Sequence, residues 1–401
     1  MRAQLETQVP RRLIGSVVLL ALVALTLRPP ITAIAPVLDR IQADLGLSTT
    51  LAGLLTTLPV ICLGVFAFVA PGLRQRWGDE RVLLGCLVVL FVGNAARAFG
   101  GAGALFGGTV VVGAGIAVAN VALPGLIKRD FPQHVPAMTA LYTMCLTLGG
   151  AVAASAVVPL AVGLGSWQFS IGLIAIPVLV ALAVALVVVR RVSAGPPAPV
   201  AAHGLWRNPL AWQVTVFMGM QSLMAYVVFG WLPVILQGRG FSPETAGFML
   251  GIQAAIQAAG SLTVPLLCRR SRDQRGIAVG LTLLVAAGFT GIVLGTAPGV
   301  VWVATVVLGV AQGASFGLAL TLFGLRSPDS DTTAALSGTA QGAGYLLAAV
   351  GPFAVGVTHE LAGNWTVPLV FVLGCCAAMG VAGLMAGRAL HVPSVHAATR
   401  A

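Results

Sequence analysis

Long apolar windows dominate this sequence. Twelve windows of about 20 mainly apolar residues follow one another between residues 13 and 388, each bounded by charges, glycine or proline. A window of this length can cross the hydrocarbon core of a bilayer as one α-helix. Only 8% of the residues are charged, whereas soluble domains carry about 25%. The sequence therefore predicts an all-α polytopic membrane protein. The expected spans are residues 13–38, 48–72, 82–101, 104–127, 137–160, 168–190, 209–236, 244–268, 276–296, 299–325, 333–357 and 365–388.

The basic residues gather in alternate loops. The segment before the first span and the segments after each even-numbered span hold 18 of the 22 Lys and Arg residues, whereas the opposite loops hold Arg40 and Arg239. Because basic loops remain on the cytoplasmic side, we expect both termini in the cytoplasm and the chain in the cytoplasmic membrane. This asymmetry accounts for the net charge of +11, so no nucleic-acid partner is expected.

The two halves of the chain match weakly. Gly344 follows Gly149 by the same number of residues as the Ala-Leu pair at Ala335 follows the Ala-Leu pair at Ala140. Internal repeats of this kind are typical of secondary transporters. We therefore expect two pseudo-symmetric six-helix bundles. The predicted parts are residues 1–190 for the N-terminal bundle, 191–208 for a Pro- and Ala-rich cytoplasmic linker, and 209–401 for the C-terminal bundle with a short tail.

The loop at residues 71–81 resembles the cytoplasmic signature of the major facilitator superfamily. Arg76 and Gly78 match that signature, whereas Gln75 stands where the family has an Asp and Pro71 where it has the first Gly. In the family this segment is implicated in gating, so the resemblance implies a gating role for Arg76 and Gly78. No charge relay through position 75 is expected. The alternative is a basic loop that only sets topology.

Three further segments together resemble the cyanate permease and nitroimidazole transporter family within that superfamily. They are Leu27–Thr32 in the first span, Asn120–Pro132 at the end of the fourth, and Ala211–Pro233 in the seventh. The resemblance covers essentially the whole chain. It implies alternating access and the transport of small, mostly planar and often anionic solutes.

Arg28 lies deep in the first span and is followed by Pro29 and Pro30, which are expected to break the backbone hydrogen bonding of the helix there. An arginine there costs about 2.5–3.5 kcal/mol on insertion scales, so it usually faces a cavity or a partner. A structural arginine would pair with a carboxylate or carbonyls, but no Asp or Glu lies clearly mid-span. We therefore favour contact with a substrate, whose carboxylate-like or nitro oxygens suit the guanidinium fork. Arg97, near the outer end of the third span, is expected to reach the interface or pair with Asp39.

The resemblance implies that the first, fourth, seventh and tenth spans line a central cavity. The candidate substrate-binding residues on those spans are Arg28, Thr32, Asn120, Gln221, Tyr226, Trp231 and Gln312, with Gln341 and Tyr345 beside them on the eleventh. Amides and aromatic rings around one arginine would suit a planar polar solute. For each amide, hydrogen bonding between helices is the alternative.

Several classes of chemistry are not expected. The sequence contains no P-loop, zinc-ligand spacing or nucleophile elbow, so we predict no enzyme, catalytic residue, metal or cofactor. All five His residues fall in loops or the tail, which leaves uniport, exchange, or protons that move with the substrate. The predicted function is a secondary active or facilitative transporter, acting as a monomer on a small-molecule substrate in the lipid bilayer. The alternative is an efflux transporter for neutral drug-like solutes, with Arg28 structural.

Overall fold

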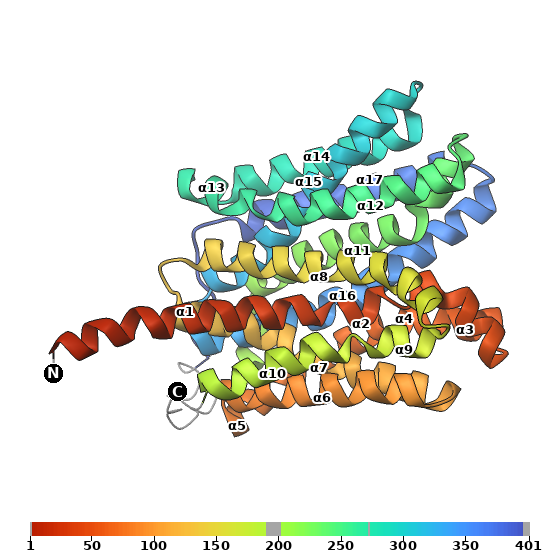
Figure 1. Cartoon of the computed structure of the whole chain (residues 1–401). Helices are drawn as coiled ribbons and strands as arrows, with labels where there is room; N and C mark the ends of the chain where they lie inside the picture. The colour runs from red at the N-terminus through yellow and green to blue at the C-terminus, as the bar shows by residue number, and fades with distance from the viewer. Residues whose placement is uncertain (1, 190–201, 272, 396–401) are drawn as a thin grey trace. The chain divides into compact units, whose positions relative to one another are not determined.

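The computed structural model describes residues 2–189, 202–271 and 273–395, and its regular elements in these ranges are all helices (Figure 1). The first half contains α1 (Arg2–Leu27), α2 (Pro29–Thr32), the 3-10 helix η1 (Ala35–Val37), α3 (Leu38–Leu45), α4 (Thr49–Ala67), α5 (Ala70–Trp77), α6 (Asp79–Phe99), α7 (Ala102–Asp130), α8 (Val135–Gly163), α9 (Trp167–Gly172) and α10 (Ala175–Val189). The second half contains η2 (Ala202–Arg207), α11 (Pro209–Gly238), α12 (Pro243–Ser261), α13 (Thr263–Arg270), α14 (Arg275–Leu294), α15 (Pro298–Leu325), α16 (Ser330–Ala362) and α17 (Thr366–Ala386).

The predicted number of membrane spans is confirmed. In the described ranges, 11 segments are long and apolar enough to cross a bilayer, and Ile14–Leu45 counts among them as one interrupted span. Counted together as one span that bends by 53°, α4 and α5 bring the number to twelve. The loop predicted between the second and third spans is thus helical except at Gly78, because α5 continues to Trp77 and α6 begins at Asp79.

The chain divides into two compact units, which are described separately. The first comprises residues 1–133 and 145–200, and the second residues 134–144 and 201–401. The first turns of α8 group with the second unit, and the division of the chain at residue 190 stays a prediction. Of the predicted linker, residues 191–201 lie outside the described residues, and the remainder folds mostly into η2, with Leu205 buried.

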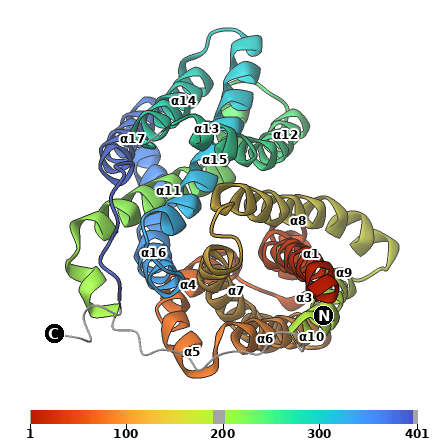
Figure 2. The ribbon, with the colours of Figure 1, turned by 90° about the vertical axis from the view of Figure 1, so that its left-hand side faces the viewer.

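In the first unit, α1, α6, α7 and α10 pack side by side (Figure 2). Close approach is possible because glycines face neighbouring backbones. A Cβ added to Gly149 of α8 would overlap the carbonyl oxygen of Leu25 in α1. In the second unit, α11 packs along α16 and α17, while α15 lies between α12 and α14.

The same crossing recurs in the second unit, as a repeat requires. A Cβ on Gly344 of α16 would lie 3.3 Å from Cα of Gly219 in α11, just as Gly149 meets Leu25. A second pair of crossings also matches: Gly93 of α6 lies against α7, and Gly288 of α14 lies against α15. These equivalences confirm the pseudo-symmetric architecture, and they identify counterpart positions in the two bundles.

Candidate functional site

The first membrane span breaks at Arg28. The helix α1 ends at Leu27, Arg28 forms a bend, and α2 begins at Pro29. Pro29 and Pro30 have no N–H groups, so neither can bond the carbonyl of the residue four positions before it. The backbone resumes when Ile31 and Thr32 donate their N–H groups to the carbonyl oxygen of Arg28, at 3.0 and 3.1 Å. The sequence signal for an interrupted span was therefore correct in position.

Three contacts within the first unit hold this break in place. Thr32 Oγ1 donates to the carbonyl oxygen of Gly150 in α8, at 2.9 Å. A Cβ on Gly150 would lie 2.7 Å from Cγ of Arg28, so the stem of this partly buried arginine rests against α8. From the other side, Arg97 Nη1 donates to the carbonyl oxygen of Pro30, at 2.9 Å. The break is thus fixed by neighbouring helices.

The expectation for Arg97 was wrong. Its side chain neither reaches the interface nor pairs with Asp39: it is 1% exposed, whereas Asp39 is exposed. The missed signal was the interruption after Arg28: α2 is a single turn that ends at Thr32, which leaves the carbonyl of Pro30 as an acceptor for a buried side-chain donor.

The other predicted site residues lie within the two bundles. Thr32 supplies the contact to Gly150, and Asn120 is buried in α7. In the second unit Gln221, Gln312, Gln341 and Tyr345 are buried, whereas Tyr226 and Trp231 are partly buried.

Several of these polar groups already have partners on their own or adjacent helices. Gln221 Nε2 donates to Ser222 Oγ at 2.6 Å, and Gln341 Nε2 donates to Ser337 Oγ at 2.8 Å. Trp231 Nε1 donates to the carbonyl oxygen of Pro352 at 2.9 Å. For the side-chain nitrogens that donate these bonds, the structure agrees with the alternative prediction, which is hydrogen bonding within or between helices.

One cluster of amides retains unused hydrogen-bonding capacity. Gln253 Nε2 in α12 donates to Gln312 Oε1 in α15 at 2.8 Å. Gln253 Oε1, Gln312 Nε2 and the Oε1 of Gln257 are buried and have no partner in the described chain. Buried polar atoms are nearly always bonded, so this set of two acceptors and one donor can take a polar ligand or waters.

At the other end of the first unit, charged residues form a network. Arg74 Nε pairs with Asp79, and Arg129 Nη1 lies 2.7 Å from Glu80 Oε1. Arg129 Nε also bonds Asp130 at 2.7 Å. The predicted gating residues lie beside it: Gly78 takes φ 79° between α5 and α6, while Arg76 is exposed over the Trp77 ring. Ion pairs between Arg74, Arg129, Asp79 and Glu80 thus lie near Gln75, which is itself uncharged.

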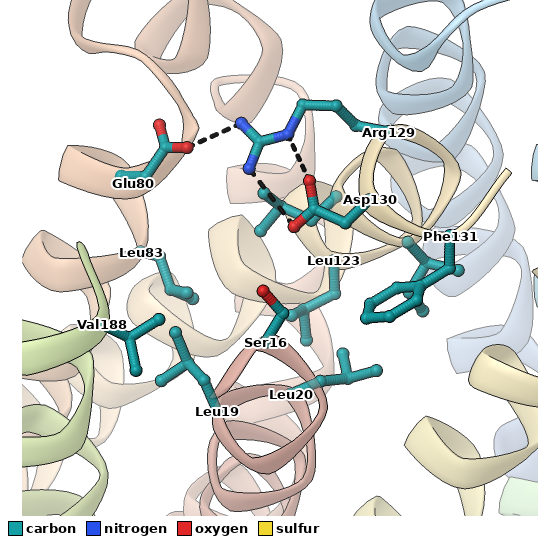
Figure 3. Close-up of a pocket in the computed structure, with 12 residues that line it drawn as sticks. Ser16, Leu19, Leu20, Glu80, Leu83, Leu123, Arg129, Asp130, Phe131 and Val188 are labelled. Carbon is teal, nitrogen blue, oxygen red and sulfur yellow. Dashed lines mark hydrogen bonds and ion pairs between the residues drawn. The ribbon is translucent and has the colours of Figure 1, made fainter. Parts of the chain in front are cut away.

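Figure 3 shows Arg129 pointing toward Glu80 and Asp130 above a small cavity between α1, α6, α7 and α10. Its other walls are mainly apolar, including Leu19, Leu83 and Val188. The volume is about 60 Å³. Ligand pockets measure roughly 300–1,000 Å³, so this cavity suits a few waters and not a transported solute.

In the second unit, an arginine at the corresponding helix end is bonded by an amide, with Asp273 nearby. Arg326, directly after α15, donates to Gln274 directly before α14, where Arg129 meets Glu80 in the first unit. Arg326 Nε also donates to the carbonyl oxygen of Ala386 at 2.7 Å. Burial lowers the pKa of Arg326 to about 10, so it remains charged at neutral pH.

Comparison with known proteins agrees with this architecture. The profile of the Major Facilitator Superfamily matches residues 17–352. The chain belongs to this superfamily. It is therefore a membrane transporter of the major facilitator type, and the family suspected from its sequence motifs is confirmed.

Two curated relatives cover nearly the whole chain. The 2-nitroimidazole transporter of Escherichia coli (strain K12) is 41% identical over 370 residues, which are 92% of this chain and 94% of that protein. The cyanate transport protein CynX of the same organism is 28% identical over 369 residues, which are 91% and 94% of the two chains. Among solved structures, the proton:xylose symporter XylE has a TM-score of 0.76 at 15% identity and covers 97% of this chain and 99% of its own. That likeness shows the shared fold.

The network of charges at Asp79 leads to a stability prediction. Asp79→Asn is expected to lower the free energy of unfolding by about 2–3 kcal/mol, because it removes a carboxylate that pairs with the buried guanidinium of Arg74 and lies 3.5 Å from Arg129. Thermal melting of the purified protein measures the change. The matched control is Asp273→Asn, whose partner Arg275 is half exposed at 3.5 Å and should contribute less than about 1 kcal/mol. Equal shifts in the two variants would contradict the prediction.

Proposed function

We propose that this major facilitator transporter moves a small planar solute carrying a negative or nitro-like group by alternating access. It would act as a secondary active or facilitative carrier in the cytoplasmic membrane, with both termini in the cytoplasm. The observation that carries the proposal is the placement of Arg28 at the break between α1 and α2. Leu25 corresponds to Gly219 in the repeat, so the counterpart of Arg28 is Ser222. The helix α11 runs unbroken through Ser222, so the second bundle forms its crossing with neither the cation nor the break.

The proposed roles follow from the chemistry of the two bundles. Arg28 would bind the negative or nitro-like group through its planar fork, and Thr32 and Asn120 would assist it. Within the second bundle, Gln312 together with Gln253 and Gln257 would offer polar groups to the solute. The unused amide atoms of these three residues support that assignment. The remaining proposed contacts are Gln221, Tyr226, Trp231, Gln341 and Tyr345.

The relatives support this substrate class by their names. The 2-nitroimidazole transporter and the cyanate transport protein are named for small solutes, one a planar nitro-heterocycle and the other an anion. The acids in the described spans of this chain lie at helix ends, as Asp79 and Asp331 do. We therefore propose uniport, exchange, or protons carried with the substrate, and we assign gating to Arg76 and Gly78.

A thermal-shift screen of the purified protein tests the substrate class. We expect saturable increases in melting temperature with cyanate, small carboxylates or nitro-heterocycles, because a ligand that binds the native state stabilises it. Ligand at 100 times its dissociation constant should add about 2.7 kcal/mol. If uncharged drug-like compounds alone raise the melting temperature, the proposal is wrong and export of neutral solutes becomes the better function.

A further inference from the structure

Arg97 is a fully buried arginine, and two of its three guanidinium nitrogens have no hydrogen-bond partner in the described chain. It lies in the last turns of α6 and is 1% exposed. Its Nη1 donates to the carbonyl oxygen of Pro30, but Nε and Nη2 are buried without a partner in the described chain. The N–H groups of Nε and Nη2 point the same way along one edge of the guanidinium. Through such an edge, arginine can bind an anion with two parallel hydrogen bonds.

The energetic cost of this arrangement requires a partner from outside the described chain. Arg97 forms no ion pair with a described acid. Each buried N–H without an acceptor costs about 1–3 kcal/mol, and more when the group is charged. Arginine cannot relieve this cost by losing its proton. A water molecule would accept the hydrogen bonds but leave the charge uncompensated. An anion would accept the hydrogen bonds and also compensate the charge.

The internal repeat shows that packing alone does not demand an arginine here. Gly93 of α6 corresponds to Gly288 of α14, so the counterpart of Arg97 is Ile292, which is 1% exposed. The apolar Ile292 thus fills the same place in the second bundle. The first bundle has also made room for the longer side chain, because a Cβ on Gly108 would lie 2.7 Å from Cγ of Arg97. The counterpart of Gly108 in α15 is Ala304.

We propose that the Nε–Nη2 edge of Arg97 binds a small monovalent anion such as chloride inside the first bundle. The anion would neutralise the guanidinium while Nη1 holds the carbonyl of Pro30, so occupancy of the site would stabilise the break in the first span. This site is separate from the proposed substrate contact at Arg28. It requires no transported solute and does not depend on the substrate class.

Bromide is the probe that tests this site. In crystals of the wild-type protein grown in bromide, an anomalous peak is expected beside the guanidinium of Arg97. In solution, replacing gluconate with bromide should raise the melting temperature saturably. Arg97→Ile, which installs the residue of the second bundle, should abolish that increase. Arg40→Gln removes an exposed arginine of the same bundle and should leave it unchanged.

Two results would overturn the proposal. One is a wild-type map with water and no bromide at Arg97, or with bromide at Arg28 alone. The other is a bromide-dependent increase that persists in full in Arg97→Ile. The crystallographic arm needs no variant, so it decides the question even if Arg97→Ile fails to fold. Because bromide binding is read without substrate, failure here is distinguishable from failure of the ligand screen.

Discussion

Arg28→Met is expected to abolish saturable uptake of the anionic substrate while the protein still folds. The methionine retains an unbranched stem to lie against Gly150, so the change mainly removes the charge and the fork. Truncating one partner of a buried, hydrogen-bonded charge pair costs about 2–5 kcal/mol, which corresponds to a loss of affinity of roughly 30- to 4,000-fold. Uptake into proteoliposomes, measured over a range of substrate concentrations, provides the readout.

Two further variants separate charge from geometry. Arg28→Lys keeps the charge but loses two-point binding, so KM should rise about tenfold or more with a smaller change in kcat. Ser222→Ala alters the counterpart position in the second bundle and should change uptake by no more than about fivefold, since a lost neutral hydrogen bond contributes near or below 1 kcal/mol. Normal uptake by Arg28→Met would contradict the substrate role of Arg28.

The spans were predictable because their physical signal is local. A stretch of about 20 apolar residues must cross the bilayer as a helix, whatever its neighbours are. The interruption at Arg28 was equally local, since Pro29 and Pro30 remove two backbone donors. The bend between α4 and α5 was not predicted, although its signal is also local: Pro71 has no N–H to bond the carbonyl of Ala67, where α4 ends.

The partners of polar side chains could not be read from the sequence, because they depend on which helices meet. Arg97 and Pro30 are 67 positions apart, and Gln253 and Gln312 are 59 apart. The predicted topology made Asp39 the acid to consider as a partner of Arg97. In the structure, Arg97 donates to the carbonyl oxygen of Pro30 instead. Likewise, the family pattern directed attention to position 75, whereas the structure forms its charge pair between Arg74 and Asp79.

Gly149→Ala is expected to destabilise the protein by about 3 kcal/mol, near the upper end for overpacking. The new Cβ would overlap the carbonyl oxygen of Leu25, and a backbone atom cannot move aside as the end of a side chain can. The helices α1 and α8 would have to separate, which would lengthen the bond from Thr32 to Gly150 and loosen the break that positions Arg28. Uptake should therefore fall together with the melting temperature.

The matched control for this substitution is Gly107→Ala, which is expected to change the stability in the opposite direction. Gly107 lies inside α7 and a Cβ there would meet nothing within 4 Å. Alanine is favoured over glycine inside a helix by about 0.5–1 kcal/mol, so Gly107→Ala should raise the melting temperature slightly and leave uptake unchanged. Thermal melting of both variants in one detergent compares them directly. If Gly149→Ala is as stable as Gly107→Ala, then the close crossing of α1 and α8 is not what holds the break, and the bonds of Arg97 and Thr32 must do so alone.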